Sequence, residues 1–413
     1  MKGKQKFFTI LILGFLSAIG PFSIDMYLPG FPGIAADLHT TVPQVGLSLS
    51  SFFIGICFGQ FLYGPLLDRF GRKPPLYAGM ILYLAASVGC VFAASVNTLI
   101  MLRLFQGLGG CVGMVAARAL VRDIFPVKEI AKIFSLLMLV IAVSPIIAPT
   151  SGGFIAAHFG WQYIFVVLTV LAVFILIAIH FVLPEGRPPD KSLSLRPKQI
   201  IHNFLLVFKE PQFVTYTLTG SMAAAGLYAY IAGSPYVFME LYKVTEQHYG
   251  WIFAIIAAGL ISASQVNTIL LRRYESEQII KIALLCQSCT GIILLAGTIF
   301  NLWNVYGMIT CIFIFLSCQG FTFPNSSALS LAPFSKNAGT ASALMGAIQM
   351  GIGTLSSAAV SVFNNKTALP MTAVMAFCSV CAFCILMMGR KFIRYKAKLH
   401  QVKEQAAEMI ITS

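Results

Sequence analysis

The sequence predicts an all-α polytopic membrane protein, with twelve transmembrane helices arranged as two six-helix bundles. Three observations predict this class. The 413 residues are 58% hydrophobic and only 10% charged, whereas soluble domains carry about 25% charged residues. The apolar residues form blocks long enough to cross a bilayer, and the basic residues gather in alternate loops. A soluble multidomain enzyme and a disordered chain are therefore excluded.

Each apolar block has the length of a membrane-spanning helix, since about 20 residues cross the hydrocarbon core. The first six blocks are Phe7–Ala35, Gln44–Leu67, Pro75–Ala94, Thr98–Ala119, Ile130–Ala157 and Tyr163–Leu183. The last six are Phe213–Ser234, Tyr249–Leu271, Ile279–Phe300, Val305–Asn325, Ala338–Phe363 and Leu369–Gly389.

The charge distribution predicts the orientation. Lys and Arg total 28 against 14 Asp and Glu, a net charge of +14. Twenty-five of the 28 basic residues fall in the two tails and in alternate loops, whereas Lys243 and Lys366 lie on the other side and Arg103 lies within a block. Basic loops stay in the cytoplasm, so both termini are expected there. Topology and contact with anionic lipid explain the basic surplus better than nucleic-acid binding does.

The two halves of the chain resemble each other weakly, with a period of six blocks. Gln106-Gly107 in the fourth block recurs as Gln319-Gly320 in the tenth, and the longest polar loop separates the two sets of six. This organisation is typical of alternating-access transporters, whose sites lie between the halves. The predicted boundaries are 1–183 for the N-terminal bundle, 184–211 for a cytoplasmic linker, 212–390 for the C-terminal bundle and 391–413 for a cytoplasmic tail.

A basic turn follows the second block. The residues of this turn that we expect to act in gating are Gly64, Asp68, Arg69, Gly71, Arg72 and Lys73. Gly71 permits a tight turn with positive φ, and Asp68 offers an acceptor among cations at a helix end. We expect this cluster to bridge to a helix of the other half in one conformational state and to release it in the other. The alternative is a turn that only follows the positive-inside rule.

These residues carry a family resemblance. The stretch 64–73 resembles the G-x-x-x-D-R-x-G-R-[RK] motif of the major facilitator superfamily. The fourth block adds Arg103-x-x-Gln106-Gly107-x-Gly109. The fifth block has a pattern similar to the antiporter motif of drug exporters, with Pro145, Pro149, Gly152 and Gly153. With the Asp25-Met26-Tyr27 stretch of the first block, the chain resembles the Bcr/CflA (bicyclomycin and chloramphenicol resistance) branch of the twelve-span drug–proton antiporters. The resemblance implies the major facilitator fold.

Asp25 and Arg103 are ionisable residues well inside predicted spans. Such groups are costly in lipid and usually line a cavity or find a partner. At about 1.5 Å per residue both fall in the outer half of the membrane at similar depth, so they are placed to meet directly or through water. We predict that Asp25 carries the coupled proton and that its distance to Arg103 sets its proton affinity. The alternative is a static ion pair that joins two spans.

Five further residues are candidate substrate contacts, because aromatic and adaptable apolar walls suit varied lipophilic compounds. They are Met26, Tyr27, Gln106, Tyr228 and Tyr230. Plain packing is the alternative for each. The prolines and glycines of the fifth block predict a kinked helix in close contact with another, with packing alone or a specific role against leakage as its function. The cysteine pairs of metal-like spacing lack nearby His or carboxylate, so no metal site is expected.

The sequence thus predicts a proton-coupled antiporter, not an enzyme, that exports small lipophilic drugs or metabolites across the bacterial inner membrane by alternating access. The expected energy source is the proton gradient with no cofactor, because no phosphate loop of the Walker type is present. The expected partners are a small-molecule substrate, protons and membrane lipid, with no nucleic acid, and the chain is expected to be a monomer. The alternative is a major-facilitator carrier of a specific nutrient or metabolite, working in uptake.

Overall fold

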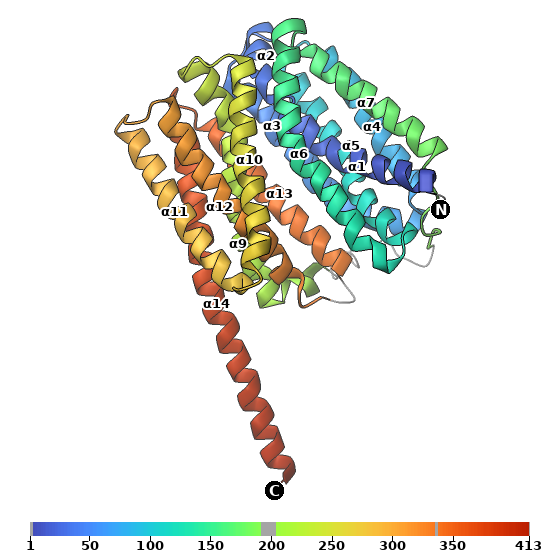
Figure 1. The fold of residues 1–413 in the computed structure, drawn as a ribbon, viewed down its shortest axis with the longest axis vertical. Coiled ribbons are helices and arrows are strands. Elements are labelled where there is room, and N and C mark those ends of the chain that lie inside the picture. The colour runs from blue at the N-terminus through green and yellow to red at the C-terminus, as the bar shows by residue number, and fades with distance from the viewer. Residues whose placement is uncertain (1–2, 191–203, 335–337, 413) are drawn as a thin grey trace.

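The computed structural model describes residues 3–190, 204–334 and 338–412. Twelve long helices make up most of this part of the chain (Figure 1). The first six are α1 (Gly3–Asp25), α3 (Val42–Phe70), α4 (Lys73–Val91), α5 (Val96–Ile124), α6 (Val127–Phe159) and α7 (Gln162–Phe181). The others are α9 (Pro211–Pro235), α10 (Glu246–Leu270), α11 (Ser276–Ile299), α12 (Val305–Leu331), α13 (Ala338–Val362) and α14 (Leu369–Thr412). The predicted all-α fold is confirmed.

Eleven of the described helices are long and apolar enough to cross a membrane. The twelfth, α9, has the length but a sequence with many Thr, Ser, Gly and Tyr residues. Nearly all of its side chains are buried in the molecule rather than turned to the outside. The low hydropathy of α9 is therefore compensated by protein neighbours, as expected for a helix at the centre of a bundle.

The first predicted block was wrong in one respect, because it is not one continuous helix. Helix α1 ends at Asp25, and the chain continues through η1 (Leu28–Gly30) and the short helix α2 (Phe31–Asp37). Pro29 and Pro32 stand at the first turns of these two segments. Proline lacks the N–H of a helix interior and clashes with the preceding turn, so it starts a helix but does not continue one.

Helix α14 runs without a break from Leu369 to Thr412, beyond the candidate span that ends at Ile393, and projects past the other helices (Figure 1). That residues 391–413 form a cytoplasmic tail stays a prediction. Of the predicted linker 184–211, residues 191–203 lie outside the described residues, and the boundaries of the two bundles stay a prediction.

Packing follows the two halves of the chain. Helices α1, α3, α4, α5, α6 and α7 contact one another extensively, and so do α9 to α14. Two helix pairs carry most of the contact between the halves, α3 with α13 and α6 with α10. We call them the α3–α13 seam and the α6–α10 seam.

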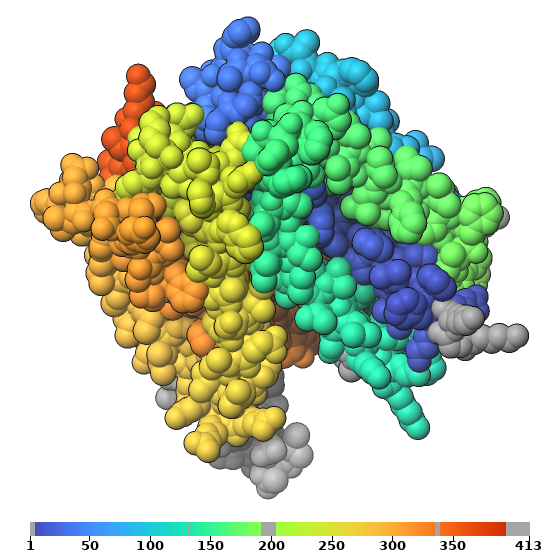
Figure 2. Space-filling model, turned by 45° about the horizontal axis from the view of Figure 1, so that its top comes forward, coloured from blue at the N-terminus to red at the C-terminus, as the bar shows by residue number. Residues whose placement is uncertain are grey.

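The two ends of the bundle differ. We call the end that carries η1, α2 and η2 (Tyr236–Leu241) the cap end, and the end that carries residues 184–190 the linker end. Along the α6–α10 seam the helices touch near the cap end and separate toward the linker end, where α13 is visible behind them (Figure 2). The α3–α13 seam is in contact further along, from Gly46 beside Ser361 to Gln60 beside Gly346.

Candidate functional site

Asp25 is the last residue of α1 and lies where the two halves meet. Its side chain is only 5% exposed. The segment η1, which follows it, contacts α6 of its own half and α9 and α10 of the other half. The end of α1 therefore brings an acidic side chain to the cap end of the α6–α10 seam.

Arg103 of α5 is fully buried inside the N-terminal half. Its guanidinium carbon lies 4.2 Å from the ring centre of Phe52, 4.5 Å from that of Tyr27 and 5.9 Å from that of Phe165. It donates hydrogen bonds to Gln106 Oε1 at 2.6 Å and to the carbonyl oxygen of Ser23 at 3.0 Å. Ring faces attract a desolvated guanidinium, so Arg103 has a set of partners without any carboxylate.

The expected contact between Asp25 and Arg103 is not found in the described residues, where no ion pair or hydrogen bond joins them. The periodicity of the helix explains this. The side chain of Ser23 shares a hydrogen bond of 2.6 Å with Tyr83 of α4, so that face of α1 is turned into the N-terminal half. Asp25 is two positions further along α1, and residues with that spacing do not share a face, so similar depth in the membrane is not sufficient for contact.

Two buried tyrosines of the other half, Tyr230 in α9 and Tyr249 in α10, belong to the helices that η1 contacts. The Tyr249 hydroxyl shares a hydrogen bond of 2.7 Å with Ser234 Oγ. The Tyr230 hydroxyl is buried without a hydrogen-bond partner in the structure. Both rings pack on Phe253, whose ring centre lies 5.5 Å from that of Tyr230 and 6.3 Å from that of Tyr249.

The glycines of the antiporter-like motif let the backbone of α6 approach its neighbours closely near the cap end. Gly152 lies against the carbonyl oxygen of Met26, so a side chain there would collide with the residue after Asp25. A Cβ on Gly153 would be 2.6 Å from the Glu246 carbonyl oxygen, and one on Gly250 would be 2.9 Å from the Pro149 carbonyl oxygen. The predicted close packing of this helix is confirmed, and its main partner is α10 of the other half.

The candidate substrate contacts occupy different environments. Tyr27 and Gln106 lie inside the N-terminal half, where Tyr27 shares a hydrogen bond of 2.7 Å with Ser48 and Gln106 donates to Ser87 at 2.8 Å. Tyr228 lies between the halves, with its ring centre 4.9 Å from that of Phe53. Met26 follows Asp25 and has its carbonyl oxygen against Gly152, whereas Tyr230 is buried in α9 and packs on Phe253 of α10. Their role in substrate binding stays a prediction.

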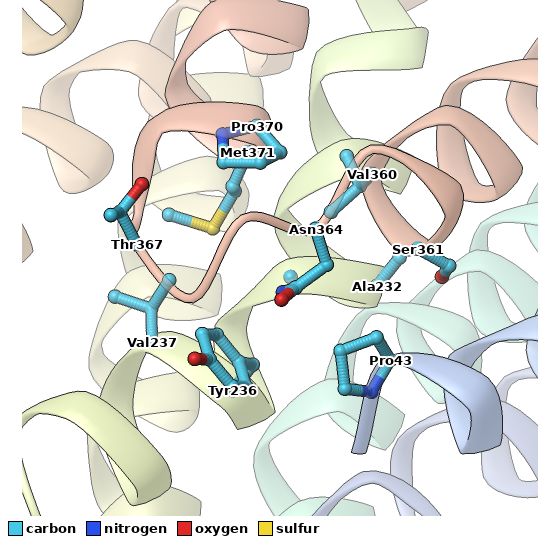
Figure 3. Close-up of a pocket in the computed structure, with 11 residues that line it drawn as sticks. Pro43, Ala232, Tyr236, Val237, Val360, Ser361, Asn364, Thr367, Pro370 and Met371 are labelled. Atoms are coloured by element: carbon cyan, nitrogen blue, oxygen red, sulfur yellow. The ribbon is translucent and has the colours of Figure 1, made fainter. Parts of the chain in front are cut away.

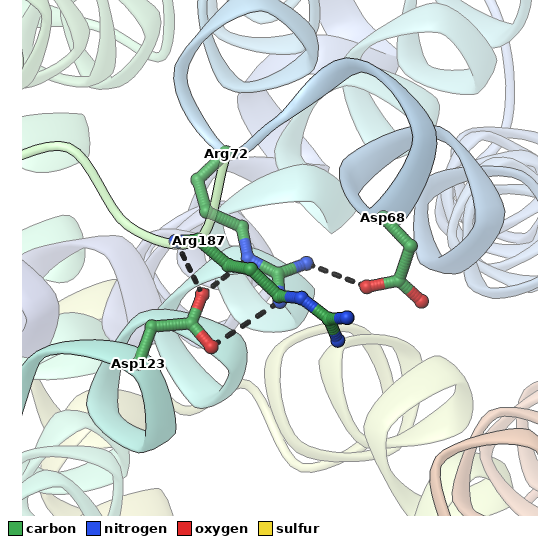
Figure 4. A network of polar contacts seen from close by, with 4 residues as sticks. All are labelled: Asp68, Arg72, Asp123 and Arg187. Atoms are coloured by element: carbon green, nitrogen blue, oxygen red, sulfur yellow. Dashed lines mark hydrogen bonds and ion pairs between the residues drawn. The ribbon is translucent and has the colours of Figure 1, made fainter. Parts of the chain in front are cut away.

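A charge cluster holds the turn between α3 and α4 (Figure 4). Arg72 donates to Asp123 at 2.6 and 3.3 Å and to Asp68 at 2.7 Å. The backbone N–H of Arg187 also donates to Asp123, at 3.1 Å. Burial alone would lower the pKa of Arg72, but the hydrogen bonds and charges of the two carboxylates outweigh burial and raise it. Against the effect of burial, the Arg72 guanidinium also holds the pKa of the Asp123 carboxyl below its usual value, so this pair stays charged at neutral pH.

The other residues of this motif support the turn. Gly71 has φ of +83°, a conformation that side chains disfavour. Lys73 lies 3.5 Å from Glu185, the guanidinium of Arg69 lies 5.9 Å from the ring centre of Phe70, and Gly64 faces open space. The ion-pair partners of Arg72 and Lys73 lie in α3, α5 and the first residues of the linker. For these two residues, the expected bridge to a helix of the other half is not seen in this conformation.

The structure has two small pockets that involve the C-terminal half. The first opens at the cap end between Pro43 of α3 and residues that include Tyr236, Asn364 and Met371 (Figure 3). The second lies among α9, α12 and α13. The enclosed volume of each is about 10 Å³, room for about one water molecule and far below the about 300–1,000 Å³ of pockets that hold drug-sized ligands. Neither is a candidate for the main substrate site.

Sequence reasoning did not identify several residues of this site. In the sequence, Asp123 is one of several charged residues of a loop. No motif includes Tyr249, Ser234 or the phenylalanines around Arg103. Only the packing of distant segments brings them together. The one signal available was the density of Tyr residues in and near α9, which already selected Tyr230.

The chain is similar to known membrane transporters along most of its length. Residues 11–358 match the family described as Major Facilitator Superfamily. The chain is 32% identical to a protein of Haemophilus influenzae named bicyclomycin resistance protein homolog, over 91% of this chain and 94% of that protein. It is 28% identical to the multidrug resistance protein MdtL of Citrobacter koseri, over 92% and 95% of the two chains.

Solved structures support the fold. The crystal structure of a D-xylose–proton symporter matches with a TM-score of 0.74 at 15% identity, over 92% of this chain and 97% of that chain. Identity at this level indicates a shared fold and not a shared substrate. The predicted major facilitator fold is confirmed.

Proposed function

The chain belongs to the Major Facilitator Superfamily, and we propose that it is a proton-coupled antiporter that exports small lipophilic drugs or metabolites across the bacterial inner membrane. Similarity to a bicyclomycin resistance homolog and to a multidrug resistance protein over nine tenths of each chain supports drug efflux. The chain is a multi-pass transporter rather than an enzyme. Its energy source in this proposal is the proton gradient, with no cofactor.

The observation that carries the proposal is the place of Asp25. Asp25 is 5% exposed where the halves meet, so a motion of the halves would change its access to water and hence its proton exchange. Polar groups buried in a membrane protein usually mark a transport pathway. Proton exchange at Asp25 would then be tied to the same motion that exposes the substrate site to one side or the other.

We assign the linker end to the cytoplasm and the cap end to the outside. The basic residues support this orientation, since the Arg69–Lys73 turn and Arg390 lie at the linker end. The structure then has the α6–α10 seam closed on the outer side (Figure 2). In this proposal the Asp68–Arg72–Asp123 cluster lies at the cytoplasmic side and affects the rate of the change between the two conformations. The protein works as a monomer, and its partners are substrate, protons and lipid.

Transport into inside-out membrane vesicles tests the proposal. With the interior acidified, we expect uptake of ethidium or bicyclomycin that stops when an ionophore collapses the gradient. Asp25→Asn keeps the shape and removes the proton, so gradient-driven uptake should fall to background while binding of a neutral compound persists. Asp37→Asn is the matched control, because Asp37 accepts from Trp161 at the cap end and lies away from the seam.

Two results would contradict the proposal. Gradient-driven transport by Asp25→Asn at the rate of the unmutated protein would place the proton carrier elsewhere. Movement of a nutrient in the same direction as protons, without efflux of either probe, would favour the uptake carrier that the sequence left open.

A further inference from the structure

The two seams between the halves differ in how far they stay closed. On the α3–α13 seam, Ser50 shares a hydrogen bond of 2.8 Å with Ser357. Nearer the linker end, Phe61 of α3 packs against an apolar cluster that includes Leu344 of α13, and its ring centre lies 5.3 Å from that of Phe204, shortly before α9. Contacts between the halves therefore hold this seam along α3 from Ser50 to Phe61.

The facing sides of α6 and α10 become more exposed toward the linker end. Pro149 and Gly250 are buried where the backbones of the two helices touch. Eleven positions nearer the linker end lie Met138 on α6 and Ile261 on α10, and that spacing returns to the same side of a helix after about three turns. Met138 is 50% exposed and Ile261 is half-buried. The two helices are therefore separated at this level, as Figure 2 shows.

The opening between α6 and α10 has apolar walls. Residues 133–149 of α6 and 250–270 of α10 include no Asp, Glu, Lys, Arg or His. The facing positions between the closing contact and the two exposed residues are Ala142, Ile146, Ala254 and Ala258. Walls of this kind suit the apolar part of a ligand.

The opening lies in the half of the membrane next to the linker end. Met138 is eleven residues from the start of α6 and Ile261 is nine from the end of α10, or about 17 and 14 Å along the helices. Half of the hydrocarbon core is about 15 Å thick. Phe61 of the closed seam, nine residues from the end of α3, lies at a similar depth. At this depth the bundle is thus open at one seam and shut at the other.

We propose that substrate enters the space between the halves sideways, from the cytoplasmic leaflet of the membrane, through the gap between α6 and α10. The substrate class that fits is an amphiphile dissolved in that leaflet, because removal of apolar surface from water is favourable and the apolar walls keep that surface out of water. This inference rests on the proposed function and on the assignment of the linker end to the cytoplasm. It adds the route of entry and the class of substrate.

Transport into acidified inside-out vesicles that contain the full chain separates this route from entry through water. Two uncharged probes are used: N-phenylnaphthylamine, a lipophilic dye whose fluorescence falls when it leaves the bilayer, and bicyclomycin, a polar compound. Ile261→Trp narrows the gap, so the KM of the dye should rise at least about fivefold at unchanged kcat, the effect of about 1 kcal/mol on entry. The KM of bicyclomycin should change by less than about twofold.

Matched variants control for the added bulk. Ile255 is 54% exposed and six positions from Ile261 on α10, a spacing that places it on another side of the helix. We expect no change for either probe in Ile255→Trp. On α6, Met138→Trp should raise the KM of the dye selectively, whereas Leu136→Trp, at a 40% exposed position on another face, should not. The α6 pair decides the matter if Ile261→Trp does not fold.

The outcomes separate the inference from the proposed function. If the vesicles take up neither probe, the proposed drug export is wrong and the inference falls with it. If bicyclomycin alone is taken up, export stands and entry from the leaflet is overturned. If the dye alone is taken up, its KM in the gap variants against the control variants decides.

Two further results would overturn the inference while export stands. A fall in kcat shared by both probes would assign the gap to the conformational step. Dye kinetics equal to those of the control variants would mean that lipid fills the gap and that substrate takes another route.

Discussion

Arg103 and Asp25 are both ionisable side chains buried in the membrane-spanning part, but their surroundings differ in kind. Arg103 is enclosed in one half of the molecule by three aromatic rings, an amide and a carbonyl oxygen. Asp25 is buried where η1 meets the other half, with no side-chain hydrogen bond to a described residue. A charge with fixed partners stabilises one arrangement, whereas a charge without them is free to change partners or protonation when the arrangement changes. Arg103 therefore has the environment of a structural residue, and Asp25 that of a switch.

The largest expected effect is that of Arg103→Ala on stability. The change leaves a cavity among the rings and an unpaired Gln106 amide oxygen, at a cost of about 3 kcal/mol or more. A fall in the melting temperature of the solubilised protein would measure it.

The comparison also predicts what Arg103→Ala leaves unchanged. Since Arg103 does not pair with Asp25 in the structure, the pH midpoint of the protonated Asp25 carboxyl band in infrared difference spectra should stay within a few tenths of a unit. A shift of about one unit or more would restore the coupling that the sequence suggested.

Gly153→Val should have the next largest effect, and it acts on the region of Asp25. The side chain would collide with the backbone of α10 at Glu246, and overpacking costs about 1–3 kcal/mol. The state with the cap end closed should lose population about tenfold, seen as increased labelling of single cysteines placed along the seam. Unchanged labelling would mean that the seam tolerates bulk and does not act as a gate.

Arg103→Lys should be intermediate between the unmutated protein and Arg103→Ala. Lysine keeps the charge but loses the planar group that stacks on Phe52 and Tyr27 and reaches two acceptors at once. We expect a loss of about 1–2 kcal/mol, measured by thermal unfolding beside Arg103→Ala. Equal melting temperatures for the lysine variant and the unmutated protein would show that charge alone is sufficient at this position.

The smallest effects are expected in the charge cluster at the linker end, which is partly open to solvent. Asp123→Asn weakens a pair in which Arg72 makes two hydrogen bonds and should slow turnover about fivefold, the effect of about 1 kcal/mol. The Asp68 side chain is 51% exposed, so Asp68→Asn should slow turnover less than about twofold. Vesicle transport rates at saturating ethidium, with binding measured separately, test both. A collapse of affinity without slower turnover would contradict a role in the conformational step.

The sequence by itself determined the fold class, the number of long helices and the family. Hydrophobic blocks report membrane-spanning helices because a chain in lipid must satisfy its backbone hydrogen bonds within each span. The motif at 64–73 and the glycines of α6 were also visible, because tight turns and close helix contacts leave few residue types to choose from. These are local constraints, and a linear sequence records them.

Only the tertiary structure decided which groups meet. Depth along two spans placed Asp25 and Arg103 together, but rotation about the helix axis separates them, since the Ser23 side chain bonds Tyr83 inside the N-terminal half and Asp25, two positions along, lies on another face. Likewise the acid that makes two hydrogen bonds with Arg72 is Asp123, 51 positions away in the sequence. Partner choice depends on how helices rotate and pack, and those quantities arise from the whole set of contacts rather than from any local pattern.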